Sequence, residues 1–296
     1  MAPSRTTTWD ADLAGLADVR TRARAARRAF DQLAGADQET LDRYLRAMAL
    51  AGTKAAEELA RLAVDETGYG VYEHKIHKNR YNTGFVARWM LERRAVGVLW
   101  VDEDARVTAV GSPMGVIAGI IPVTNPTSTA LFKCLAAVKS GNAIVLAPHP
   151  RAARCTLRAA EIMAEAAVGA GAPEGLISCL ASPTLSSTQE LMRRDEIALV
   201  LATGGPGMVR AAYSSGKPTI AGVGGRPGRG RRDDHHVEVV RQRHGVRGRA
   251  VGGRRRGRRR SIPCRVRAAG CLLDERGAAG RARPHPVRRA GGATPG

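Results

Sequence analysis

Three short segments of this 296-residue chain combine residue types that can bind or polarise a ligand, and each directly follows an apolar run. They are residues 122–126, 148–150 and 203–207. In the first segment, the side-chain amide of Asn125 can donate a hydrogen bond to a developing oxyanion, in a loop that prolines stiffen. In the second, the imidazole of His149 can contact ribose or phosphate. The three segments are therefore candidates for one ligand site.

The third segment has the character of a phosphate-binding turn. Its glycines let a ligand approach the backbone, and the helix predicted after Gly207 offers unpaired N–H groups and the positive end of its dipole. The spacing is not G-x-G-x-x-G, and a Gly-rich strand-to-helix turn is also ordinary turn chemistry. Asn125 before a proline is equally typical of a turn or helix cap, and His149 of a surface loop. Both interpretations stay open on these residues alone.

The elements that must position these segments follow a regular alternation from residue 115 onward. Apolar, strand-like runs alternate with helical patterns, and another helix is predicted after Gly207; the runs are 115–122, 143–147, 176–180 and 197–202, and the helical patterns 127–139, 151–169 and 186–194. Four strands with intervening helices predict an α/β fold, a Rossmann-like parallel sheet with helices on both faces. Right-handed crossovers bring the strand-ending loops to one edge, where open α/β sheets bind ligands. We therefore expect the three segments to lie side by side.

The residues before the sheet predict helices and a small flanking sheet. Apolar spacing over residues 10–64 favours two helices, with Gly35 ending the first and Asp37 capping the second. Helix continues over 65–90 after a Gly-containing turn, and two short strands around residue 103 form an arm or flanking sheet. We divide the chain into residues 1–110 with these N-terminal helices and flanking strands, 111–220 with a dinucleotide-binding core, and a separate tail over 221–296.

The tail has a composition of its own. Residues 221–296 hold 21 Arg, no Lys and 5 acidic residues, and so carry +16 of the net charge of +20. Aromatic residues are absent and apolar ones recur at neither helical nor strand spacing, which predicts disorder. Three interpretations stay open: a shifted reading frame of a GC-rich gene, which fits the loss of Lys; a solvated basic tail; and an arm that grips nucleic acid through phosphates. The lack of aromatics for base stacking argues against the arm.

Composition also argues against several classes of protein. The N-terminus has no apolar segment after a basic one, and the longest apolar stretch, residues 114–123, is too short for a membrane span, so we expect a cytoplasmic protein. The cysteines are odd in number and lack Cys-x-x-Cys or His/Cys ligand spacing, so neither disulfides nor a metal is expected. Buried structural thiols are the expectation for Cys134, Cys155 and Cys179.

Residues from about 71 to 220 resemble the CoA-acylating branch of the aldehyde dehydrogenase superfamily, which includes the first half of bifunctional aldehyde-alcohol dehydrogenases. Five segments carry the resemblance: PMGVI at 113–117, IPVTNPTSTALFK at 121–133, GNAIVLAPHPRA at 141–152, GAGAPEGLI at 169–177 and LATGGPGMVRAAYSSGKP at 201–218. The resemblance implies that a cysteine thiolate attacks a small aldehyde, hydride passes to NAD or NADP, and coenzyme A releases the acyl group as a thioester. It implies no metal, and a homo-oligomer for the intact enzyme.

The resemblance also implies roles for individual residues. Asn125 would supply the oxyanion-hole amide. The residues implied at the dinucleotide are Ile121, Pro122, Thr124, His149, Pro150, Thr203, Gly204, Gly205 and Met208. After Ile220, however, the chain departs from the family, whose Asp-Asn-Gly-x-x-Cys stretch holds the nucleophile; neither Cys264 nor Cys271 has those neighbours. We therefore expect a truncated protein that is inactive as written. The alternative is a nucleotide-binding domain with a nucleic-acid-binding tail.

Overall fold

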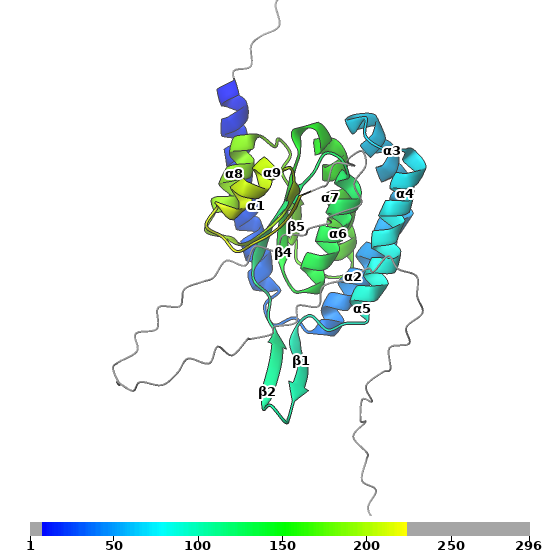
Figure 1. Ribbon diagram of the computed structural model, residues 1–296, viewed down its shortest axis with the longest axis vertical. Coiled ribbons are helices and arrows are strands. Elements are labelled where there is room, and N and C mark those ends of the chain that lie inside the picture. Colours follow the sequence, from blue (N-terminus) through cyan, green and yellow to red (C-terminus); the bar gives the residue numbers. More distant parts are fainter. Residues whose placement is uncertain (1–7, 224–296) are drawn as a thin grey trace, which may run out of the picture. The chain divides into compact units, whose positions relative to one another are not determined.

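The computed structural model describes residues 8–223, so the predictions for residues 224–296 lie outside the described part of the chain. Residues 8–223 form a five-stranded parallel sheet of order β5-β4-β3-β6-β7 and a separate two-stranded antiparallel sheet (Figure 1). Helices cover both faces of the large sheet. The α/β fold with a Rossmann-like parallel sheet is thus confirmed.

The strands of the large sheet are β3 (Val116–Ile121), β4 (Ala143–Pro148), β5 (Ile177–Cys179), β6 (Ile197–Gly204) and β7 (Thr219–Val223). Every residue of β3 and β4 is buried, because helices pack on both faces of these central strands, and this explains their continuous apolar sequence. The first four strands match the predicted runs. The fifth, β7, was not predicted, and it extends beyond residue 220, where we placed the end of the core.

Two helix layers enclose the sheet (Figure 1). One face carries α6 (Pro126–Lys139) and α7 (Ala153–Gly169), the latter preceded by the 3₁₀ turn η2 (Pro150–Ala152). The opposite face carries α1 (Thr8–Gln32), α8 (Leu185–Arg193) and α9 (Pro206–Tyr213). The connections β3-α6-β4 and β4-α7-β5 run in one direction from β3, and the connection through α8 to β6 runs in the other. The direction of winding therefore changes at β3, where ligand crevices form in such sheets.

A further layer of helices packs over α6 and α7. Its elements are α2 (Gln38–Lys54), α3 (Ala56–Thr67), α4 (Tyr72–Arg80), the π-helical η1 (Tyr81–Val86) and α5 (Ala87–Leu91). As predicted, Gly35 adopts a left-handed conformation (φ 81°) and the Asp37 carboxylate caps α2, accepting a hydrogen bond from the Thr40 N–H at 2.8 Å. The prediction of only two helices over 10–64 is wrong, since a third begins at Ala56. Neither Gly nor Pro marks that break, so the local sequence carried no signal for it.

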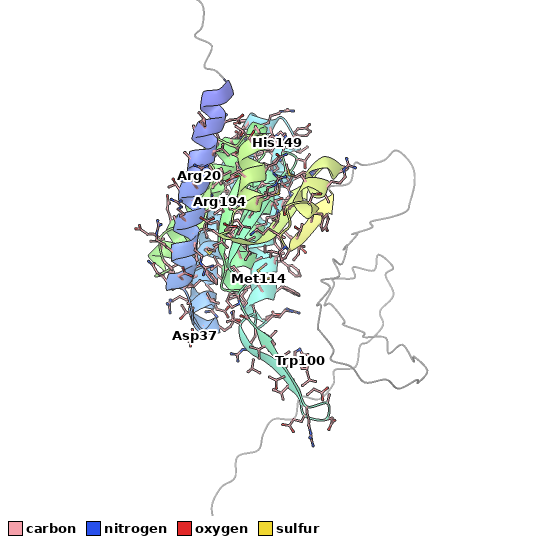
Figure 2. The ribbon with its side chains drawn as sticks, turned by 90° about the vertical axis from the view of Figure 1, so that its left-hand side faces the viewer. Arg20, Asp37, Trp100, Met114, His149 and Arg194 are labelled. Atoms are coloured by element: carbon pink, nitrogen blue, oxygen red, sulfur yellow. The ribbon has the colours of Figure 1, made fainter. Side chains whose placement is uncertain are left out.

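The predicted pair of short strands is a hairpin of β1 (Gly97–Asp102) and β2 (Val107–Gly111). Figure 2 shows it extending past the helices and the large sheet, with Trp100 at the end of the molecule opposite His149. All residues of β1 are exposed, including Trp100 with 55% of its surface accessible. The arm or flanking sheet expected from the sequence is therefore an arm.

Candidate functional site

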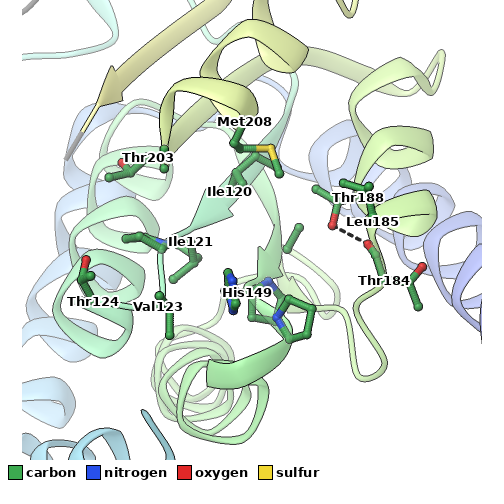
Figure 3. Close-up of a pocket in the computed structure, with 16 residues that line it drawn as sticks. Ile120, Ile121, Val123, Thr124, His149, Thr184, Leu185, Thr188, Thr203 and Met208 are labelled. Atoms are coloured by element: carbon green, nitrogen blue, oxygen red, sulfur yellow. Dashed lines mark hydrogen bonds between the residues drawn. The ribbon is translucent and has the colours of Figure 1, made fainter. Parts of the chain in front are cut away.

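The order of the strands brings the three candidate segments together. Strand β3 lies between β4 and β6, and all three run in the same direction, so their carboxyl ends are neighbours. A cavity of about 530 Å³, which we call the strand-end cavity, opens at this edge (Figure 3). Its walls come from the ends of β3, β4 and β6 and from the starts of α8 and α9. The side-by-side arrangement expected from the sequence is confirmed.

All residues that the resemblance implied at the dinucleotide line this cavity: Ile121, Pro122, Thr124, His149, Pro150, Thr203, Gly204, Gly205 and Met208. Asn125 does not line it but directly follows Thr124, at the start of α6. Thr203 and Gly204 belong to β6 rather than to a loop, because they pair with Gly222 and Val223 of the unpredicted β7. The structure thus gathers these residues at one cavity, while their binding roles remain predictions.

One wall of the strand-end cavity was missed by the sequence reasoning. Thr184, Leu185 and Thr188 line it from the segment that follows β5 and from the first turn of α8. The Thr184 hydroxyl accepts a hydrogen bond from the Ser187 N–H at 3.0 Å, and Thr188 donates to the Thr184 carbonyl at 2.9 Å (Figure 3). The sequence could have revealed this wall, because the segment follows the strand predicted at residues 176–180 and therefore lies at the same edge of the sheet as the other strand-ending segments.

The start of α9 suits an anion. Gly205 occupies the N-cap position in extended conformation (φ −74°, ψ 170°), and no side chain caps the helix. The first-turn N–H groups after Pro206 are therefore available to a ligand, and the helix dipole favours negative charge there. A Cβ atom added to Gly205 would enter open space, whereas one on Gly204 would lie 3.1 Å from the Met208 Cβ. Gly205 thus keeps the cavity open, and Gly204 allows close packing of the strand on α9.

His149 is exposed, but its loop is anchored. Its backbone N–H donates to the Ile121 carbonyl at 3.1 Å, which extends the β3–β4 ladder by one bond. Its Nδ1 accepts from the Arg151 N–H at 3.1 Å, so in the neutral ring the proton resides on Nε2. Partial desolvation, and then the Arg151 charge, lower the pKa of His149 below its usual value. The imidazole is therefore neutral at neutral pH, with one N–H to donate.

Asn125 occupies the N-cap position of α6, yet its side chain makes no capping hydrogen bond. The backbone around it is held from outside instead: Thr129 donates to the Asn125 carbonyl at 2.6 Å, and Lys75 of α4 donates to the Thr124 carbonyl at 3.3 Å. Buried Asn79 of α4 accepts a hydrogen bond from Thr127 at 3.1 Å. The side-chain amide of Asn125 is therefore left for a ligand while its backbone is fixed.

Glu66, near the end of α3, braces the turn that carries His149. Its carboxylate accepts hydrogen bonds from the N–H groups of Arg154 at 2.9 Å and Cys155 at 2.7 Å, and so caps α7 from another element. Burial works to raise the pKa of Glu66, but these hydrogen bonds outweigh burial and hold it below its usual value. The sequence did not reveal this brace, because the two ends lie 88 residues apart.

Cys134, Cys155 and Cys179 are buried and unpaired, as expected. Burial raises the pKa of Cys134 and of Cys155 to about 12 each, so neither thiol ionises near neutral pH. A nucleophilic cysteine is thus absent from residues 8–223. Over the same residues there is no group of three or more His, Cys, Asp or Glu side chains that could hold a metal, and no helix long and apolar enough to cross a membrane.

Comparison with known proteins agrees with this geometry. A sequence model described as "Aldehyde dehydrogenase family" matches residues 2–226. The bifunctional aldehyde-alcohol dehydrogenase of Escherichia coli K12 is 42% identical over 213 residues, which cover 72% of this chain and 24% of that protein. The crystal structure of an acetylating aldehyde dehydrogenase from Geobacillus thermoglucosidasius superposes with a TM-score of 0.69 at 48% identity, covering 71% of this chain and 46% of that one.

A third similar structure is a propionaldehyde dehydrogenase from Rhodopseudomonas palustris with bound CoA and an acylated cysteine. It superposes with a TM-score of 0.61 at 29% identity, covering 69% of this chain and 46% of that one. The chain therefore spans less than half the length of each of these three proteins.

Proposed function

The chain belongs to the aldehyde dehydrogenase family, and on that premise we propose that its strand-end cavity binds the pyridine dinucleotide of a CoA-acylating aldehyde oxidation. The observation that carries the proposal is the convergence, at one cavity, of the residues at the ends of β3, β4 and β6 and an uncapped helix start. Such a constellation, at the point where winding reverses, is where α/β sheets bind nucleotides.

Each wall of the cavity has a proposed role. The backbone at Thr203–Gly205 and the start of α9 would face the diphosphate, with the N–H groups and the helix dipole offsetting its charge. His149 would donate its Nε2 proton on the adenosine side. The apolar residues Ile120 and Ile121 would form the floor. When bound, the dinucleotide supplies the hydride acceptor for aldehyde oxidation.

Asn125 is proposed as the oxyanion donor for the adduct between aldehyde and cysteine. Its support is a side-chain amide free of capping bonds on a backbone held by Lys75 and Thr129. The aldehyde and coenzyme A are proposed as the remaining substrates, since relatives are named for acetylating and acylating activities. The buried thiols of residues 8–223 do not serve as the nucleophile in this proposal.

We further propose that the chain as written does not complete the reaction, because no segment of it matches the family's nucleophile stretch. The encoding DNA, translated in its other two frames downstream of codon 220, is the simplest check. Recovery of an Asp-Asn-Gly-x-x-Cys segment supports a shifted frame, and its absence from both frames removes that explanation.

The proposal also covers the organisation, assembly and location of the chain. We propose that the chain divides at residues 110 and 220. We propose that it forms a homo-oligomer through the hairpin of β1 and β2, whose apolar residues are exposed. A cytoplasmic location is also proposed, and it is consistent with the unpaired thiols of residues 8–223. NAD and NADP both remain candidates. Arg151 lies in η2 and Arg154 in the first turn of α7, and a comparison of NADH with NADPH affinity tests whether either arginine meets a 2′-phosphate.

The test of dinucleotide binding is a fluorescence titration of the full chain with NADH, with Gly205→Val as the blocking variant. The backbone of Gly205 suits any residue and an added Cβ atom meets nothing within 4 Å, so folding should be retained; a valine at this cavity-lining position, beside the uncapped start of α9, should lower the affinity at least about tenfold. Gly169→Val, whose side chain also meets nothing within 4 Å but lies at the far end of α7, is the control and should bind as the parent does. Equal affinity in both variants would remove the proposal.

A further inference from the structure

Lys133 of α6 has an ionisable side chain that is buried in the core. Only 2% of its surface is exposed, and it heads the largest fully buried side chains of residues 8–223. Its Nζ donates to the Ile120 carbonyl at 2.7 Å and to the Leu201 carbonyl at 2.8 Å. No carboxylate of the described residues forms an ion pair with it, in contrast to Lys139 at the end of the same helix, which pairs with Asp42.

The two carbonyls that Lys133 binds belong to different strands at the point where those strands part. The β3–β6 ladder ends at the pair Ile120 and Ala202, whereas β3 continues beside β4 to Ile121. Beyond this point β6 follows β7, and the strand-end cavity opens between β3 and β6. Ile120 and Leu201 are both still paired in the β3–β6 ladder, and a carbonyl oxygen has two lone pairs, so each can also accept a hydrogen bond from the Lys133 Nζ.

An amine is chemically suited to this fork. Desolvation lowers the pKa of Lys133 to about 7, and the neutral form has two N–H donors, which equals the number of carbonyls that it reaches. An apolar residue of the same length would fill the space but donate no hydrogen bond to either carbonyl. The two hydrogen bonds of Lys133 thus connect the ends of β3 and β6 through α6.

We propose that Lys133 is a positioning residue for the dinucleotide: by binding one carbonyl of β3 and one of β6, it sets the separation of two strand ends that line the strand-end cavity. This inference rests on the proposed function only for the identity of the ligand. The clamp itself is a property of the two strand ends and is open to test without any ligand.

The test compares Lys133→Met with Lys139→Met in the full chain by hydrogen exchange with mass spectrometry. Both substitutions remove a buried lysine from α6, but only the first removes the clamp. Loss of the clamp should accelerate amide exchange at residues 118–124 and 200–205 by at least about tenfold, because the two strand ends lose the hydrogen bonds that connect them to α6. Lys139→Met should leave those segments at the parental rate.

A second variant and a second readout keep the outcome decisive. Lys133→Gln retains two N–H donors without charge, and it should restore part of the protection that methionine loses; it also serves if the methionine variant does not fold. Affinity for NADH should follow the same order, parent above Gln above Met, while Lys139→Met matches the parent.

Equal exchange in both methionine variants, or acceleration spread evenly over the sheet, overturns the clamp. Failure of the parent to bind NADH removes the proposed function but leaves the exchange test of the clamp intact.

Discussion

Several side chains that do not line the strand-end cavity bind the backbone of the segments that form or adjoin it. Glu66, Lys75 and Lys133 do not line the cavity, yet each binds the backbone of a segment that does or that adjoins it. Each belongs to an element other than the one it holds, so sequence spacing could not identify it. Candidate ligand-facing residues were accessible to sequence reasoning because they follow strands directly, whereas the braces depend on tertiary contact.

The brace at Glu66 gives a prediction at this scale. Glu66→Ala should lower the free energy of unfolding at neutral pH by about 1–2 kcal/mol, the usual cost of losing a helix cap, because the first N–H groups of α7 lose their acceptor. Denaturant unfolding of the full chain measures it. The neighbouring surface variant Asp65→Ala, whose carboxylate makes no such bonds, should change little.

The same carboxylate fixes the sign of a pH dependence. Its folded-state pKa is lowered, so its contribution to stability is complete above the unfolded-state pKa and disappears as pH falls through the folded-state value. The difference in unfolding free energy between the parent and Glu66→Ala should therefore shrink on acidification below the usual range of a glutamate. A difference that is independent of pH contradicts the assigned role.

At the scale of elements, the close contact between α2 and η1 depends on a glycine, because a Cβ atom would not fit there. Gly52 of α2 packs on η1 so closely that a Cβ atom would lie 2.7 Å from the Thr83 Cγ2 and 3.3 Å from the Leu131 Cδ2. The Thr53 hydroxyl donates to the Thr83 hydroxyl at 2.8 Å across the same contact. The widened π-helical turn at Tyr81–Val86 thus coincides with this contact, which explains why helical periodicity alone did not predict it.

Two glycine substitutions test this packing. Gly52→Ala should destabilise the protein by about 1–3 kcal/mol through overpacking against Thr83. Gly84→Ala in η1, where a Cβ atom meets nothing within 4 Å, should be neutral or stabilise by about 0.5–1 kcal/mol. Thermal or denaturant unfolding of both variants provides the measurement, and equal effects would show that the α2–η1 contact is not tight.

Elements were predicted best where burial dictates the sequence. The continuous apolar runs of β3 and β4 and the alternation that follows them determined the sheet, since a strand covered on both faces tolerates few polar residues. Edge strand β7 was missed because its apolar run, residues 220–223, is short and continues directly into the Arg- and Gly-rich sequence. The break at Ala55 was missed because packing, and not a Gly or Pro, ends α2 there.

For the molecule as a whole, the described residues form the cavity proposed to bind the dinucleotide, but they include no exposed thiol. The strand-end cavity is framed by three strands and two helix starts, while the thiols of residues 8–223 are buried and protonated. The chain spans less than half the length of each relative compared above. The central proposal that can be tested on this chain alone is that its strand-end cavity binds a dinucleotide.

The most direct measurement of that claim is an experimental structure of the full chain with NADH. We expect the diphosphate at the start of α9, beside Gly205, and the remainder of the dinucleotide along the ends of β3 and β4 near His149. A nucleotide bound away from these strand ends, or none at saturating NADH, would contradict the account.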